Sequence, residues 1–185
     1  MAVTVVLCLV FVVRLNRQNE QLREALKSRA IRGAEAGTLS GPPGQMTGDL
    51  IPEFTTTDWD GKSYAVRFDG KTRYLFYIFG QGCSSCAKYM PQWQKVAAQL
   101  ASPTLKPVGI YLEPEPDPVF KKKYASEKAP LTMIQMPGMG IQRSFRVVMV
   151  PQTVVVSSSG VVEWTALGTF DDNTVAELMK FFGRR

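Results

Sequence analysis

Cys83 and Cys86 lie three positions apart in the stretch FGQGCSSCAKYMPQW, which runs from Phe79 to Trp93. Two thiols at this spacing can carry out thiol–disulfide exchange, supply half of a metal site or form a structural disulfide. At the start of a helix, free backbone N–H groups and the positive dipole end stabilise a thiolate, which is the attacking species. We therefore expect Cys83 to be the exposed nucleophile. Cys86, one turn into the helix, is expected to be the shielded thiol that resolves the mixed disulfide on Cys83.

The other two interpretations of the cysteine pair are weaker. A C-x-x-C disulfide closes a loop so small that it stabilises a fold little, and a domain of this size does not need a disulfide for its stability. A zinc site needs more than two thiols, and the third cysteine, Cys8, lies in an apolar run near the N-terminus. The chain has no histidine, which excludes Ser–His and Cys–His triads and any histidine-ligated zinc or copper site.

Copper binding stays open as an alternative function. Met133, Met136 and Met139 recur at three-residue intervals in LTMIQMPGMG. Thioether and thiolate sulfurs are soft ligands that suit Cu(I), so these methionines and the cysteine pair fit a Cu(I) chaperone or assembly factor. Methionines at this spacing are also common as gap-fillers in a hydrophobic core.

Charge and length narrow the class of protein. The 185 residues allow one domain with a terminal extension. The formal charge of +6 is shared equally between residues 1–45 and 46–185. A nucleic-acid-binding protein would concentrate this excess on its folded domain, so we exclude that class.

The elements that position the cysteines follow from hydrophobic periodicity. The continuous apolar run Tyr74–Phe79 predicts a strand buried on both faces, and a helix is predicted from Cys86 to Leu100. The remaining predictions are a hairpin at 53–68 around Asp60-Gly61, strands at 106–113 and 131–136, two strands within 153–168, and helices at 119–126, 140–147 and 171–182, the last capped by Asp171 or Asp172. The cysteines thus lie where a central strand ends and a helix begins, which is where chemistry collects in open α/β sheets.

A second feature is Val150-Pro151 in VMVPQTVVV, one residue before the stretch TVVV. Proline cannot donate to a sheet ladder, so its place at the start of a buried strand is unusual. We predict a cis Val150–Pro151 bond that turns the chain beside the cysteine loop. Val150 would then be free to pair with a strand of the substrate.

Together these motifs resemble the thioredoxin superfamily: a strand, C-x-x-C and a helix with Pro91, then Val150-Pro151 before a hairpin and a C-terminal helix. IPEFTTTDWDGKSYAV and the long gap between Cys86 and Pro151 resemble the TlpA/ResA-type membrane-anchored redoxins, and the layout is most similar to the methylamine dehydrogenase accessory (MauD-like) redoxins. The resemblance covers residues 50–182. It implies an α/β thioredoxin-like fold, with a central mixed sheet flanked by helices and an N-terminal β-hairpin. It also implies a thiol–disulfide oxidoreductase that works in the reductive direction on protein disulfides, receives electrons from a membrane thiol donor and needs no organic cofactor.

The sequence departs from the TlpA-like pattern at two positions. Tyr89 stands where these proteins usually have Glu three residues after the second cysteine, and Gly82 stands where they usually have Trp. The Tyr74–Phe79 strand has no acid in the place of the Asp of thioredoxin, so no catalytic base is assigned. A peroxiredoxin shares the scaffold, but Phe76 and Gly80 occupy the positions where its motif needs Pro and Thr.

The N-terminal run MAVTVVLCLVFVV has thirteen residues without a charge and ends at Arg14. As a helix it would span about 20 Å, against about 30 Å for the hydrocarbon core of a bilayer. We predict a membrane anchor at 1–15 with either an upstream start or a snorkelling Arg14, a juxtamembrane helix and Gly/Pro-rich linker at 16–48, and the thioredoxin-like domain at 49–185. The basic residues that follow the run favour a cytoplasmic domain, whereas the resemblance favours the extracytoplasmic side, which we expect.

Overall fold

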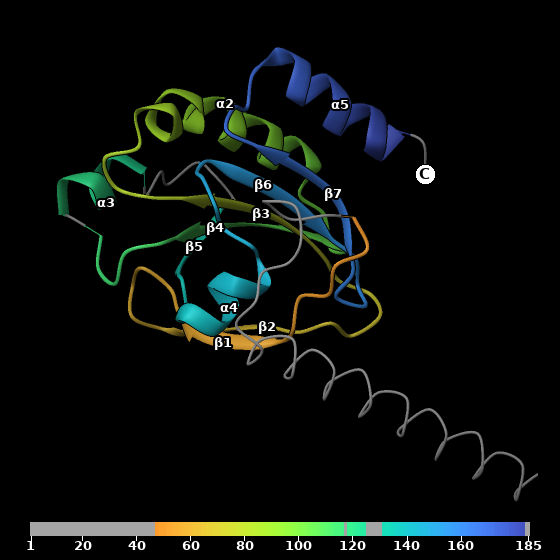
Figure 1. Ribbon diagram of the computed structural model, residues 1–185, viewed down its shortest axis with the longest axis horizontal. Helices are drawn as coiled ribbons and strands as arrows, with labels where there is room; N and C mark the ends of the chain where they lie inside the picture. Colours follow the sequence, from red (N-terminus) through yellow and green to blue (C-terminus); the bar gives the residue numbers. More distant parts are fainter. Residues whose placement is uncertain (1–46, 117, 125–130, 184–185) are drawn as a thin grey trace, which may run out of the picture. The chain divides into compact units, whose positions relative to one another are not determined.

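The computed structural model describes residues 47–116, 118–124 and 131–183 (Figure 1). All of these residues belong to one compact unit that spans 41–185. The predicted anchor at 1–15 and the predicted linker, apart from Thr47 and Gly48, lie outside the described residues. Within the described part of the chain, no helix is long and apolar enough to span a membrane.

A five-stranded mixed sheet in the order β5-β4-β3-β6-β7 forms the centre of this unit. β3 pairs in parallel with β4 and antiparallel with β6, so it is covered by a strand on each side. The strands are β3 (Arg73–Phe79), β4 (Leu105–Tyr111), β5 (Thr132–Gln135), β6 (Gln152–Val156) and β7 (Val162–Leu167). The apolar run predicted as a doubly covered strand is confirmed, because Tyr74 to Phe79 are all buried.

Helices cover one face of the sheet, as Figure 1 shows for α2 (Ser84–Leu100) and α5 (Asp172–Gly183). Alternate residues of β3, namely Leu75, Tyr77 and Phe79, pack on this face with residues of α2 and with Tyr124 of α3 (Pro118–Tyr124). The other residues of β3 pack on the opposite face with Phe54 and Phe145, which belong to the hairpin and to the end of α4 (Met139–Ser144). The alternation of a strand therefore gives the unit two cores, one on each side of the sheet.

The N-terminal hairpin closes one edge of the sheet. β1 (Phe54–Thr57) and β2 (Ser63–Val66) pair antiparallel around the predicted Asp60-Gly61 turn, which Asp58 caps by accepting the N–H groups of Asp60 and Lys62. The N–H of Trp59 donates to the carbonyl of Met133 on β5, so the hairpin covers this exposed edge strand.

The predicted thioredoxin-like α/β fold is confirmed in class and element order, with small shifts at the ends of elements. The helix after the first cysteine begins at Ser84 and not at Cys86, because Cys83 acts as its N-cap. Of the two N-cap candidates for the last helix, Asp171 makes the capping contact, since its carboxylate accepts the N–H of Thr174.

Candidate active site

The loop that joins β3 to α2 brings the first cysteine to the start of the helix. Gly82 has a φ of +75°, a conformation that side chains disfavour, and it turns the chain directly before Cys83. Cys83 then has an extended backbone (φ −79°, ψ 98°), as an N-cap residue requires. Its Sγ accepts the backbone N–H of Cys86 at 3.0 Å. The predicted position of the first sulfur against a free N–H of the helix is therefore confirmed.

A disulfide joins Cys83 and Cys86, whose Cα atoms lie 5.2 Å apart. The two residues differ in exposure: Cys83 is half-buried, whereas Cys86 is 2 % exposed and belongs to the core under α2. In this oxidised form the N–H of Cys86 reaches a disulfide sulfur. After reduction the same N–H and the end of the helix dipole would face a thiolate at Cys83.

The backbone of Val150 lies beside the Cys83 sulfur, although the two residues are 67 positions apart in the chain. The Val150–Pro151 peptide bond is cis, as predicted. The carbonyl oxygen of Val150 is 3.6 Å from Cys83 Sγ. The buried Pro151 uses its own carbonyl to accept the N–H of Gly168, so this turn is fixed to the end of β7.

Exposed apolar side chains adjoin the Val150–Pro151 turn. Val148 and Met149 are 54 % and 52 % exposed and directly precede it. Leu167 of β7 is also exposed and pairs with Gln152, the first residue after the turn. The sulfur of Met149 would be 3.6 Å from a Cβ placed on Gly168. These residues place apolar surface next to the turn whose Val150 carbonyl faces the sulfur.

The three methionines of the copper alternative do not come together. Met133 is buried on the face of the sheet covered by α2, where a Cβ on Gly109 would meet its sulfur, so it fills the gap above that glycine. Met136 packs against the core on the opposite face, as two residues three positions apart in an extended chain must. Met139 is 62 % exposed at the start of α4. No group of three or more His, Cys, Asp or Glu side chains that could hold a metal occurs among the described residues.

Polar residues near the cysteines include Tyr89, Lys88 and Tyr77. Tyr89, in the place of the expected Glu, packs partly buried against the core, with Lys88 Nζ 5.0 Å from its ring centroid. In the described part of the chain, the polar contacts of the Cys83 sulfur are with the Cys86 N–H and the Val150 carbonyl. Tyr77 lies under α2, 4.8 Å from Trp93 between ring centroids, and its burial raises the pKa of the phenol far above the ordinary value. It therefore stays protonated and is not a base.

Sequence reasoning missed Glu113, which follows β4 and reaches the loop before the cysteines. Its Oε1 accepts the N–H of Gln81 at 2.9 Å. Its Oε2 is buried and has no hydrogen-bond partner among the described residues. The signal available in the sequence was its place at the end of the apolar strand predicted at 106–113, because the carboxyl ends of parallel strands meet at one edge of a sheet.

Comparison with known proteins gives a family and a fold. Residues 47–165 match the AhpC/TSA family. No curated protein matches the chain. The solved structures of similar fold include the thioredoxin domain of a thiol-disulfide oxidoreductase from Bacteroides vulgatus, with a TM-score of 0.60 and 20% identity over 74% of this chain and 98% of that one.

Two further structures agree with this fold. A protein from Chlorobium tepidum, described as a thiol:disulfide interchange protein DsbE, has a TM-score of 0.61 and 17% identity, over 75% of this chain and 96% of that one. A secreted disulfide oxidoreductase of Mycobacterium tuberculosis, described as homologous to DsbE of E. coli, has a TM-score of 0.54 and 19% identity, over 71% of this chain and 96% of that one. At these identities the likeness shows the thioredoxin-like fold.

Proposed function

This chain belongs to the AhpC/TSA family, and we propose that it is a thiol–disulfide oxidoreductase that acts on cysteine pairs in other proteins. The observation that carries the proposal is the asymmetry of the pair. Cys83 is accessible and its sulfur accepts an N–H at the start of α2, whereas Cys86 is 2 % exposed. An accessible, stabilised thiolate with a shielded neighbour is the arrangement that disulfide exchange needs. The names of the three similar structures describe the same chemistry for those proteins.

The reaction runs through one mixed disulfide. The Cys83 thiolate attacks one sulfur of a target disulfide, a new S–S bond forms, and the other target sulfur leaves as a thiolate that takes up a proton. Cys86 then loses its proton and attacks the Cys83 sulfur, which releases the second target thiolate. Two electrons and two protons pass to the target, and the Cys83–Cys86 disulfide seen in this structure is the oxidised product.

Val150 and Pro151 are proposed to hold the target beside Cys83. The carbonyl of Val150 already faces the sulfur, so an extended target segment can pair with this backbone while its cysteine reaches Cys83. The exposed side chains of Val148, Met149 and Leu167 can contact apolar residues that flank the target cysteine. Affinity then comes from the backbone pairing and from these apolar contacts together.

The exchange reaction is tested with the full chain in detergent, in a C8S background that leaves only Cys83 and Cys86. The reduced protein is mixed with insulin as the disulfide substrate. The C8S chain is expected to reduce insulin, C83S to lose the activity, and C86S to accumulate a mixed disulfide through Cys83 that gel electrophoresis resolves. Full insulin reduction by C83S would contradict the proposal. A C8S chain that shows no disulfide exchange with any dithiol would contradict it as well.

The reductive direction is a separate part of the proposal, supported by the resemblance to TlpA/ResA-type redoxins. Reductases of this fold have reduction potentials of about −270 mV, whereas a strong oxidant of the same fold has a reduction potential of about −120 mV. Equilibration with glutathione and dithiothreitol buffers measures which applies here. A value at the oxidising end would contradict a reductase and leave the exchange chemistry intact.

The cellular setting is proposed from the sequence. The apolar run at 1–15 is proposed to anchor the chain, with the redox domain on the extracytoplasmic side and electrons supplied by a membrane thiol donor of the MauD-like systems. The Mycobacterium tuberculosis protein is described as secreted, which agrees with this side. Labelling of Cys83 in intact cells by a membrane-impermeant maleimide, after reduction, tests the orientation.

Two other functions are less well supported. Peroxide reduction lacks the Pro and Thr of the peroxiredoxin motif, since Phe76 and Gly80 occupy those positions. Copper binding loses its ligand set, because Met133 and Met136 pack on opposite faces of the sheet. Competitive Cu(I) titration of the reduced chain, with the cysteine and methionine variants, tests what remains of this alternative.

A further inference from the structure

Glu113 is a partly buried acid beside the cysteine loop that the proposed reaction does not use. It lies two residues after β4, and the N–H of Leu112 between them donates to the Phe79 carbonyl at the end of β3. Its Oε1 accepts the Gln81 N–H, and its Oε2 is buried without a hydrogen-bond partner in the described part of the chain. A buried acceptor that is left unpaired costs free energy, so its retention needs a reason.

The chain makes room for this carboxylate at Gly80. A Cβ on Gly80 would lie 2.9 Å from Glu113 Oε1 and 3.4 Å from Oε2, which is closer than the carboxylate could tolerate without moving. Gly80 does not have a positive φ, so its backbone would accept another residue. The close approach of Glu113 is therefore the reason that the structure gives for a glycine here.

Tyr111 holds the same loop from the same strand. Its hydroxyl donates to the side-chain oxygen of Gln81 at 3.0 Å, and its ring packs edge-on against Trp59. Gln81 is thus held at both its backbone and its side chain, two residues before Cys83. A neutral acceptor at position 113 would hold the Gln81 N–H equally well, so the hydrogen bond does not explain the charge.

The charge can act on the sulfur because the carboxylate contacts the loop that carries Cys83 and one of its two oxygens is buried. Two residues of chain span at most about 7 Å, which limits the distance from Gln81 to Cys83. The other charged groups on the neighbouring elements are engaged or exposed. Lys88 of α2 lies over the Tyr89 ring, Lys121 of α3 donates to the Trp59 carbonyl and lies 3.5 Å from Asp60, and Glu115 is exposed. Glu113 makes no ion pair with a described cation that would cancel its charge.

We propose that Glu113 is a positioning residue for the redox pair: it fixes the loop through Gln81, and its negative charge disfavours the thiolate of Cys83. A less stable thiolate makes the dithiol less stable relative to the disulfide, so the pair becomes a better reductant. The carboxylate opposes the stabilisation by the helix end and sets the balance toward reduction. This inference rests on the proposed function and supplies a structural reason for its direction.

The decisive variant is E113Q in the C8S background. Glutamine keeps the acceptor for Gln81 and the size of the side chain and removes only the charge. At an effective dielectric typical of partly buried sites, we expect the equilibrium constant with glutathione to shift about three- to fivefold toward the dithiol. The pKa of the Cys83 thiol, measured from the pH dependence of iodoacetamide alkylation, is expected to fall by the corresponding amount.

Two variants serve as controls. E115Q makes the same change of charge at an exposed residue two positions on, and it should leave both readouts at the C8S values. E113D keeps the charge and should retain most of the effect of glutamate. An E113Q equilibrium equal to that of C8S, or equal shifts in E113Q and E113D, would show that Glu113 only holds the loop.

A separate variant covers the case in which E113Q does not fold. The methyl group of G80A must displace the carboxylate from Gln81 with its charge intact. Unchanged potential and alkylation profile in G80A would overturn the positioning role. Failure of the C8S chain itself to equilibrate with glutathione would instead refute the proposed function, so the two outcomes are distinguishable.

Discussion

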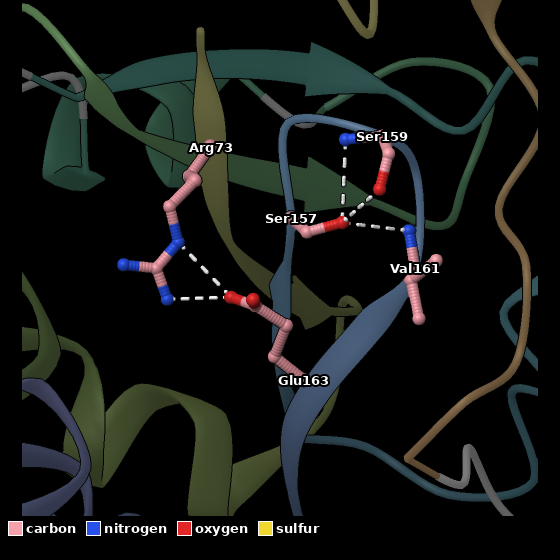
Figure 2. A network of polar contacts seen from close by, with 5 residues as sticks. All are labelled: Arg73, Ser157, Ser159, Val161 and Glu163. Carbon is pink, nitrogen blue, oxygen red and sulfur yellow. Dashed lines mark hydrogen bonds and ion pairs between the residues drawn. The ribbon is translucent and has the colours of Figure 1, made fainter. Parts of the chain in front are cut away.

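The polar groups at the two ends of β3 differ in their hydrogen bonding. Where the strand begins, Arg73 donates from Nε and Nη2 to one carboxylate oxygen of Glu163 on β7, and the Ser157 hydroxyl oxygen accepts the N–H groups of Ser159 and Val161 (Figure 2). Where the strand ends, Glu113 keeps one buried oxygen unpaired beside the loop that leads to Cys83. We call these regions the serine end (Arg73, 157–161 and Glu163) and the cysteine end (80–86, Glu113 and 148–152).

This difference indicates that the serine end stabilises the fold and that the cysteine end serves the reaction. At the serine end the guanidinium of Arg73 also lies over the rings of Phe181 and Phe182 on α5, so one side chain ties the sheet to the last helix. The cysteine end keeps exposed apolar residues such as Val148 and Met149 and a buried oxygen without a donor. Features of this second kind cost stability and are typically retained where function needs them. Substitutions at the serine end should therefore change unfolding and leave the reactivity of Cys83 unaltered.

Gly160→Ala should give the largest loss of stability. Gly160 has a φ of +86°, and a Cβ there would lie 2.9 Å from the backbone oxygen of Ile51 and 3.0 Å from the Phe68 ring. Backbone strain and overpacking together should cost about 2–4 kcal/mol of unfolding free energy, measured by urea denaturation. The rate of Cys83 alkylation in the folded protein should not change.

Gly70→Ala is the matched control for Gly160→Ala. It lies at the same end, has a φ of +77°, and has nothing within 4 Å of its added Cβ. Only the backbone strain remains, so the loss should be about 1–2 kcal/mol. Equal losses in the two variants would show that the contacts with Ile51 and Phe68 contribute nothing.

Arg73→Met should have the next largest effect. Methionine keeps an apolar stem against Phe181 and Phe182 but leaves the carboxylate of Glu163, whose side chain is 16% exposed, without the guanidinium. Loss of hydrogen bonds to a charged group of this burial should lower the unfolding free energy by about 1.5–3 kcal/mol.

The double variant Arg73→Met, Glu163→Met tests the origin of that loss. It removes the carboxylate as well as the guanidinium, so part of the stability should return. If the double variant is as unstable as the sum of the single ones, the ion pair is not the cause. If either single variant shifts the glutathione equilibrium, the separation between the two ends is wrong.

The parts of the cysteine end that could be predicted are those encoded locally. The apolar run of β3, the C-x-x-C spacing and Val150-Pro151 each occupy a few consecutive residues, and their placement was predicted correctly. The opposite faces of Met133 and Met136 were also readable, since residues three apart in a strand point to opposite sides. The copper alternative was weaker than its three-residue spacing suggested, because that spacing matches a helix and not a strand.

The parts that could not be predicted depend on register between distant strands. Glu113 reaches Gln81 because β3 and β4 pair in parallel with Phe79 opposite Tyr111, and nothing in either segment alone specifies that register. Arg73 and Glu163 are separated by 90 residues in the chain. They come together because β6 pairs with both of their strands, β3 and β7. Side chains of this kind are found from the fold and not from the motif.

The smallest predicted effects concern two aspartates, the exposed Asp69 before β3 and the partly buried Asp171 before α5. Asp69 accepts the backbone N–H groups of Thr72 and Lys71, and Asp171 accepts the backbone N–H and the hydroxyl of Thr174. The bond from Thr72 is the main cause that lowers the pKa of Asp69, and the bond from the Thr174 backbone is the main cause at Asp171. Each carboxylate therefore stabilises the folded state above the unfolded pKa of about 4, and this contribution disappears as the pH falls through the lower folded pKa.

Asp69→Asn and Asp171→Asn should thus reduce the unfolding free energy at neutral pH, and their difference from the unsubstituted chain should shrink between about pH 5 and pH 2. Urea denaturation at a series of pH values measures this difference. A deficit that stays constant down to pH 2 would mean that asparagine fails through its geometry and not through its missing charge. Because neither carboxylate contacts the cysteine pair, the pH profile of Cys83 alkylation should be the same in both variants. A shift in Asp171→Asn alone would show that the start of α5 also belongs to the electrostatics of the cysteine end.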